Sequence, residues 1–164
     1  MNLPDPNALL DRLAESIRPC LTSDTALLGI HTGGVWVMDA LAARLGLDLP
    51  RGVLDIAFYR DDFSRIGLHP EAKPSNIPFE IEGRPILLVD DVLYTGRTIR
   101  AAMNLIFDYG RPASIDLAVL VDRGGRELPI CARHVGAVLD LGRHVSLTRA
   151  EDGTLSLALK EATP

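Results

Sequence analysis

One segment of this 164-residue chain constrains its fold more than any other: an apolar run that ends in two acidic residues and then opens a helix. Ile86 to Val89 is continuously apolar, which predicts a strand buried on both faces of a sheet. Asp90 and Asp91 follow directly, and Tyr94 to Thr98 leads into an amphipathic run. A buried strand, a polar loop and a helix in this order are typical of an α/β protein with a parallel sheet.

Further apolar runs alternate with helical patterns along the chain. We expect strands at 26–30, 53–59, 115–121 and 135–139, helices at 35–45 and 97–109, and a first helix that begins at Pro6 and ends at Pro19. Residues 145–148 and 155–159 flank a turn and predict a terminal hairpin. The polar segment 60–77 is long for a small domain, which favours a functional or mobile loop. This order predicts a mostly parallel, twisted sheet with helices on both faces.

Composition limits the classes of function. The formal net charge is −5 with only two lysines, whereas proteins built mainly to bind nucleic acid are normally basic. The two cysteines, Cys20 and Cys131, give neither a disulfide framework nor metal-ligand spacing. No apolar run approaches the roughly 20 residues that span a bilayer, and the N-terminus does not resemble a secretory signal. We therefore expect a single cytoplasmic domain over residues 1–164.

The polar residues after Val89 predict a site for a ribose phosphate. Ligands of parallel α/β sheets bind at the carboxyl ends of the strands. The helix that opens near Gly96 presents backbone N–H groups to a phosphate, and the hydroxyls of Thr95 and Thr98 add donors. Asp90 and Asp91 are suited to accept hydrogen bonds from sugar hydroxyls or to hold Mg²⁺.

This string resembles the signature of the type I phosphoribosyltransferases. Additional segments match more narrowly: Leu54 to Asp62, Asn76 to Phe79, Gly110 to Pro112 and Leu120 to Ile130. With them the chain looks like a member of the pyrimidine-operon attenuator/uracil phosphoribosyltransferase family, from about Leu28 to Gly136. The resemblance implies a type I phosphoribosyltransferase fold with a mobile loop and a small hood.

The resemblance also implies a reaction and partners. Uracil and 5-phosphoribosyl 1-pyrophosphate would give UMP and pyrophosphate with Mg²⁺, as in pyrimidine salvage. Some family members bind a leader RNA in response to UMP and so regulate pyrimidine biosynthesis genes, and the family forms dimers or larger assemblies.

Site residues carry over from the family by position. The acidic pair Asp90 and Asp91 would face the ribose diol and the metal, and Arg60 would close over the pyrophosphate. The remaining substrate-binding positions fall into three groups, which are Thr32 and Gly33 for pyrophosphate, Tyr94, Thr95, Gly96, Arg97 and Thr98 for the 5′-phosphate, and Asp122 and Arg123 for the base.

One departure from the family leaves an alternative open. The family usually carries Thr-Arg-Gly in its pyrophosphate loop, whereas here Thr32-Gly33-Gly34 lacks the cation. The alternative is therefore a UMP-responsive RNA-binding regulator with little catalytic activity, although the acidic balance argues against it. Another base in place of uracil is also left open. A phosphoacceptor receiver domain is excluded, because neither Lys73 nor Lys160 follows a buried strand.

Overall fold

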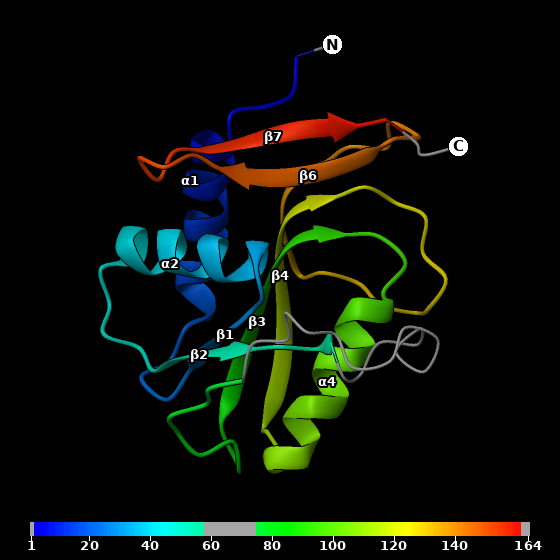
Figure 1. The fold of residues 1–164 in the computed structure, drawn as a ribbon. Coiled ribbons are helices and arrows are strands. Elements are labelled where there is room, and N and C mark those ends of the chain that lie inside the picture. The colour runs from blue at the N-terminus through cyan, green and yellow to red at the C-terminus, as the bar shows by residue number, and fades with distance from the viewer. Residues whose placement is uncertain (1, 58–74, 162–164) are drawn as a thin grey trace.

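The apolar runs of the sequence form a five-stranded parallel sheet in the computed structural model, which describes residues 2–57 and 75–161 (Figure 1). The sheet order is β2-β1-β3-β4-β5. Its strands are β1 (Ala26–Ile30), β2 (Arg51–Leu54), β3 (Pro85–Leu93), β4 (Ser114–Asp122) and β5 (His134–Val138). The helices are α1 (Pro6–Ile17), the 3₁₀ turn η1 (Arg18–Cys20), α2 (Gly33–Leu45) and α4 (Arg97–Tyr109). The predicted α/β class is confirmed.

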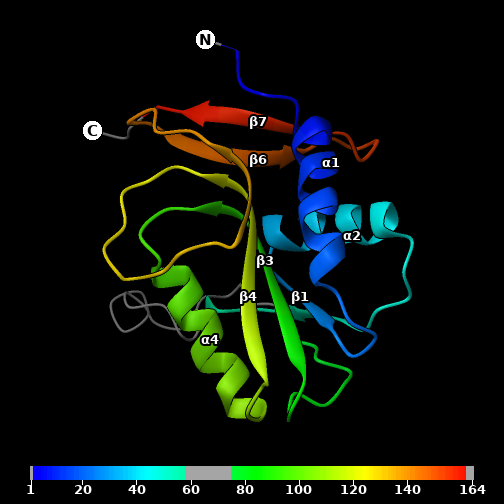
Figure 2. The ribbon, with the colours of Figure 1, turned by 180° about the vertical axis from the view of Figure 1, so that it is seen from behind.

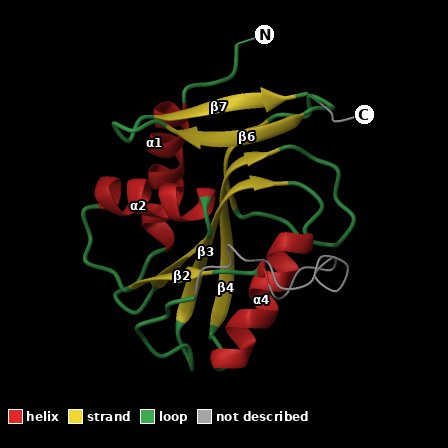
Figure 3. Ribbon diagram, in the orientation of Figure 1, coloured by secondary structure: helices red, strands yellow, loops and turns green. Residues whose placement is uncertain are grey.

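Helices cover both faces of the sheet (Figures 2 and 3). Successive side chains of a strand point to opposite faces, so each buried strand supplies two cores. Leu27 and Leu87 pack in one apolar cluster with residues of α1 and α2. Their neighbours Leu28 and Leu88 pack in a second cluster with residues of α4. The continuous apolar runs are therefore explained by burial on both sides.

Local signals in the sequence set the helix ends. Asp5 caps α1, because its Oδ1 accepts a hydrogen bond from the backbone N of Asn7 at 3.1 Å. Pro6 occupies the first turn of the helix, where its missing N–H costs nothing. At the C-terminal end of α2, Gly46 adopts a φ of 63°, the left-handed conformation that commonly terminates helices.

The chain ends in the predicted hairpin of β6 (His144–Arg149) and β7 (Leu155–Lys160). In Figure 1 it lies beyond the carboxyl ends of β3 and β4. Val145 and Leu147 are 1% and 6% exposed, so they anchor the hairpin to the domain. No helix within residues 2–57 and 75–161 has the length and apolarity to cross a membrane.

Several element boundaries differ from the sequence expectation, most of all in β2, β3 and α2. The strand expected at 53–59 ends at Leu54, because Asp55 turns the chain: its Oδ1 accepts from the backbone N of Ala57 at 2.9 Å. Residues 58 and 59 lie outside the described part. β3 continues through the acidic pair to Leu93, since its ladder with β4 extends to Leu93 and Asp122. α2 begins at Gly33, two residues before Val35.

Candidate active site

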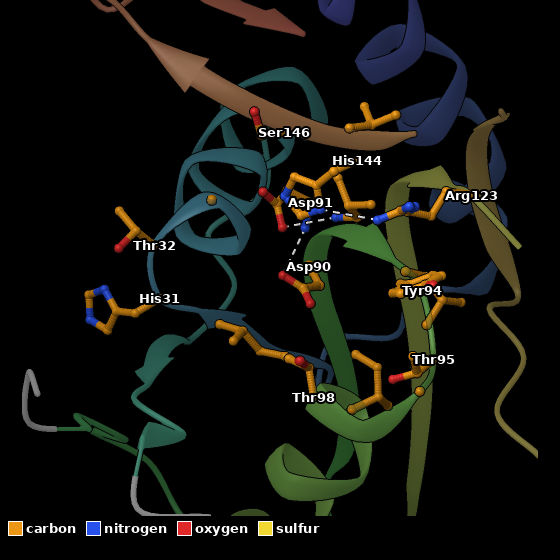
Figure 4. A pocket seen from close by; sticks show the side chains of 17 residues that line it. His31, Thr32, Asp90, Asp91, Tyr94, Thr95, Thr98, Arg123, His144 and Ser146 are labelled. Carbon is orange, nitrogen blue, oxygen red and sulfur yellow. Dashed lines mark hydrogen bonds between the residues drawn. The ribbon is translucent and has the colours of Figure 1, made fainter. Parts of the chain in front are cut away.

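A cavity of about 310 Å³ lies at the carboxyl ends of β1 and β3, beneath the terminal hairpin (Figure 4). It is bordered by the N-termini of α2 and α4 and by the start of β6. Its polar lining residues are His31, Thr32, Asp90, Asp91, Tyr94, Thr95, Thr98, Arg123, His144 and Ser146. Seven of the residues expected from the sequence to form the site are among them, and the expected residues Gly33 and Gly96 line the cavity as well.

The acidic pair lies within β3 and not in a loop after it, which corrects the sequence expectation. Asp90 is only 6% exposed, and its Oδ1 accepts from the backbone N of Asp91 at 2.9 Å. Asp91 in turn accepts from the backbone N of Val92, also at 2.9 Å. These bonds hold both carboxylates in place. Since both residues line the cavity, both are placed to accept from ligand hydroxyls.

The N-terminus of α4 opens into the same cavity. Gly96 precedes the helix with a φ of 93°, and the Thr95 hydroxyl accepts a hydrogen bond from the backbone N of Arg97 at 3.2 Å. The loop is held by the carbonyl of Thr95, which accepts from the backbone N of Glu127 at 2.9 Å and of Leu128 at 3.1 Å. An α-helix leaves its first N–H groups without partners inside the helix, and Thr98 faces the cavity. This geometry suits an anion such as a phosphate.

Two of the expected binding side chains point elsewhere. The Nε of Arg97 donates to Glu127 Oε2 at 2.9 Å, and Arg97 does not line the cavity. The Asp122 carboxylate accepts from Arg126 Nη2 at 2.6 Å and from the backbone N of Gly124 at 3.0 Å. Asp122 therefore braces the loop after β4 and does not line the cavity. Arg60 lies outside the described residues.

The N-terminus of α2 lies directly against β3. The His31–Thr32 peptide bond is cis, and no side chain caps the helix at Thr32. A Cβ added to Gly33 would collide with the Asp91 carboxylate, and one added to Gly34 would lie 2.6 Å from the Val89 carbonyl oxygen. Two glycines therefore let the helix approach the acidic pair closely.

Arg123 reaches the cavity from the loop after β4. Its Cζ lies 3.9 Å from the centre of the Tyr94 ring, which is a cation–π contact. Its Nη1 lies 3.1 Å from His144 Nδ1, at the start of β6 (Figure 4). The sequence reasoning missed His144 and Ser146, because a short exposed-looking hairpin carries no pattern that shows where it packs.

The side chains of the cavity suit Mg²⁺ better than a metal whose ligands all come from the protein. Among the described residues, no group of three or more His, Cys, Asp or Glu side chains could hold a metal ion. Mg²⁺ is commonly bound by one or two carboxylates together with substrate phosphates and water. Asp90 and Asp91 supply that number of carboxylates beside the N-terminus of α4.

Comparison with known proteins agrees with this geometry. Residues 5–140 match the model of the phosphoribosyl transferase domain. The chain is 50% identical, over 98% of either sequence, to a bifunctional protein PyrR of Pseudomonas fluorescens. It is 49% identical, over its full length and 99% of the relative, to a bifunctional protein PyrR of Nitrosococcus oceani.

Solved structures agree on the fold. A hypoxanthine phosphoribosyltransferase of Staphylococcus aureus superposes with a TM-score of 0.64 at 22% identity, over 82% of this chain and 73% of that one. A hypoxanthine-guanine-xanthine phosphoribosyltransferase superposes with a TM-score of 0.68 at 19% identity, over 98% of this chain and 94% of that one. The chain therefore belongs to the phosphoribosyltransferase family, and within it to the bifunctional PyrR proteins.

Proposed function

We propose that this protein is a uracil phosphoribosyltransferase that makes UMP and pyrophosphate from uracil and 5-phosphoribosyl 1-pyrophosphate. One observation carries the proposal: the acidic pair of β3, the open N-terminus of α4 and the Arg123 side chain border a single cavity. A ribose phosphate has a diol and a phosphate at opposite ends, so it needs acceptors and donors in one cavity. The 50% identity to bifunctional PyrR proteins supports the same assignment.

Each part of 5-phosphoribosyl 1-pyrophosphate, the phosphoribosyl donor of the reaction, has a matching group in the cavity. The 5′-phosphate would bind the backbone N–H groups at the start of α4 and the hydroxyls of Thr95 and Thr98. The ribose diol would donate to Asp90 and Asp91. The pyrophosphate would lie at Thr32 and Gly33, where the N-terminus of α2 offers backbone donors in place of the cation that this sequence lacks.

The reaction breaks the bond between the anomeric carbon and the pyrophosphate oxygen, and that electron pair leaves with pyrophosphate. A bond forms to a ring nitrogen of uracil, and the proton of that nitrogen passes to the departing pyrophosphate or to water. Positive charge develops on the ribose ring, and the fixed carboxylates of Asp90 and Asp91 stabilise it electrostatically. Because Asp90 is buried, its field is weakly screened by water. When bound, Mg²⁺ would supply charge neutralisation on the pyrophosphate, held by the same two carboxylates.

A direct assay tests the proposal. Purified protein, uracil, 5-phosphoribosyl 1-pyrophosphate and Mg²⁺ should give UMP, followed by chromatography or by radiolabelled uracil. Hypoxanthine, guanine and cytosine in parallel define the base specificity. No UMP above the protein-free control, or a faster reaction with a purine, would overturn the assignment to uracil.

A second activity is also proposed, since the relatives are named bifunctional. UMP-dependent binding to the leader RNA of pyrimidine genes fits that name and the family resemblance. Several arginines of the first helices bond within the protein: Arg12 donates to Gly136 O at 2.9 Å, and Arg44 to Asp11 Oδ1 at 2.8 Å. These bonds reduce the donors left for RNA phosphates, so transferase activity is the first assignment.

Binding of labelled leader RNA with and without UMP, at two salt concentrations, tests the second activity. The regulatory assignment requires tighter binding with UMP and weaker binding at high salt. Sedimentation of the same sample tests the dimer or larger assembly that the resemblance implies.

A further inference from the structure

Arg123 is held over the cavity by groups of three residues. Its Cζ lies 3.9 Å from the centre of the Tyr94 ring, and its Nη1 lies 3.1 Å from His144 Nδ1 (Figure 4). Its backbone N donates to the carbonyl of Leu93 at 3.0 Å. The ring of Tyr94 is itself backed by Gly125, where an added Cβ would collide with it. The guanidinium is therefore fixed on one side by a ring and at one edge by an imidazole.

The bond between Arg123 and His144 has a defined direction. A guanidinium has only N–H donors, so Nδ1 of His144 accepts and carries no proton. A neutral imidazole then carries its proton on Nε2. One bond to His144 uses one of about five donors of the guanidinium, which leaves others for a carbonyl oxygen of a base.

His144 comes from a part of the chain that the shared domain does not include. The family model matches residues 5–140, whereas His144 begins β6 and pairs across the hairpin with Lys160. Val145, the next residue, is 1% exposed, so the backbone at this point is anchored in the core. His144 is thus an exposed acceptor that the terminal hairpin supplies from an anchored backbone.

We propose that His144 is a positioning residue that holds the Arg123 guanidinium at the base end of the cavity and so sets the affinity for the pyrimidine. This inference rests on the proposed function. An unrestrained arginine loses the freedom of several rotatable bonds when it binds a ligand, and that loss weakens binding. Because His144 and Tyr94 already order the Arg123 side chain, that side chain loses less conformational freedom when the base binds.

The inference predicts which kinetic constant changes. Arg123 would contact the base before and during bond formation alike, so its loss of order raises KM for the base and leaves kcat nearly unchanged. The donor binds at Asp90, Asp91 and the helix ends, and its KM should stay the same. A general loss of structure would instead lower kcat and raise both KM values.

The experiment compares variants at one position. His144→Leu keeps the bulk and removes the acceptor, and His144→Ala is a second variant without it. His144→Asn restores an acceptor near the position of Nδ1. Thr148→Val is the matched control, because Thr148 bonds to Ser156 on the same hairpin away from the cavity.

We expect His144→Leu and His144→Ala to raise KM for uracil about tenfold, the effect of losing one hydrogen bond to a charged partner. His144→Asn and Thr148→Val should stay within about twofold of the parent. Combining His144→Leu with Arg123→Leu should be no worse than Arg123→Leu alone, since His144 acts through Arg123.

Three results would overturn the inference: an unchanged KM for uracil in both acceptor-free variants, equal increases in both KM values, or full additivity with Arg123→Leu. A parent protein that makes no UMP contradicts the proposed function instead. The test then compares the Kd for UMP of the variants with that of the parent, measured by calorimetry. A tenfold higher Kd in the acceptor-free variants supports the inference. An unchanged Kd, or no binding of UMP by the parent, overturns it.

Discussion

The two glycines at the start of α2 are adjacent, but a methyl group added to each meets a different kind of neighbour. At Gly34 an added Cβ would lie 2.6 Å from the Val89 carbonyl oxygen and 3.0 Å from the Asp90 Cα, both of them backbone atoms. At Gly33 it would meet the carboxylate of Asp91, which is the end of a side chain. Gly34→Ala should therefore affect stability, and Gly33→Ala should affect activity.

The magnitudes follow from what must move. In Gly34→Ala the helix and the strand must separate, and overpacking of this kind costs about 1–3 kcal/mol. For a chain of this length each kcal/mol lowers Tm by about 2–4 °C, so we expect a decrease of about 2–12 °C. In Gly33→Ala the Asp91 side chain rotates away, and alanine is the better helix former, so Tm should change by less than about 2 °C. Loss of one positioned carboxylate should lower kcat/KM at least about tenfold.

Thermal unfolding by circular dichroism and initial-rate kinetics at saturating Mg²⁺ measure both effects, and each variant is the control for the other. Equal decreases in Tm for the two variants would refute the reasoning, because they would mean that the Asp91 side chain cannot move aside for the added methyl group. Full activity in Gly33→Ala would refute the assignment of Asp91 to the reaction.

Three other perturbations have expected outcomes. Asp91→Asn should raise the Mg²⁺ concentration needed for half-maximal rate, measured by titrating Mg²⁺ at fixed donor, and an unchanged requirement would assign the metal elsewhere. Arg126→Met removes a partly buried bond of 2.6 Å to Asp122 Oδ2 and an exposed bond of 2.6 Å to the Tyr94 carbonyl, and should cost about 1–3 kcal/mol in urea unfolding. The third concerns His134, since burial, and then the neighbouring Arg133, lower its pKa from the ordinary 6.5. The unfolded chain then binds more protons, so the free energy of unfolding should be greatest above about pH 6.5 and fall as the pH drops below it. His134→Gln should reduce this dependence of the unfolding free energy on pH, and an equal dependence in the variant would exclude His134 as its source.

Strand and helix identity followed from the sequence because burial on both faces leaves a continuous apolar run, as in Ile86 to Val89. Helix ends also follow from local chemistry, as at Asp5 and Gly46. The boundaries that failed depended on long-range pairing. Nothing in the sequence near Asp90 shows that β4 continues to pair with β3 as far as Leu93.

The candidate site was predictable where its chemistry is local. Thr95, Gly96 and Thr98 lie at a helix start that the sequence itself defines, and the cavity forms there. The direction of a long side chain was not predictable: Arg97 turns to Glu127, a residue 30 positions away. His144 was missed for a related reason, because its role depends on where a separate hairpin packs.

The contacts of α1 have a consequence for how the molecule forms during synthesis. Arg12 bonds to Gly136, 124 residues later, and the Ser16 hydroxyl lies 2.7 Å from Nδ1 of His134. Since α1 precedes β5 in the chain, it meets one of its final neighbours only when β5 has been made. Until then part of its apolar face is exposed, a condition that favours association between nascent chains. A chain truncated before residue 134 should therefore be recovered mainly as aggregate.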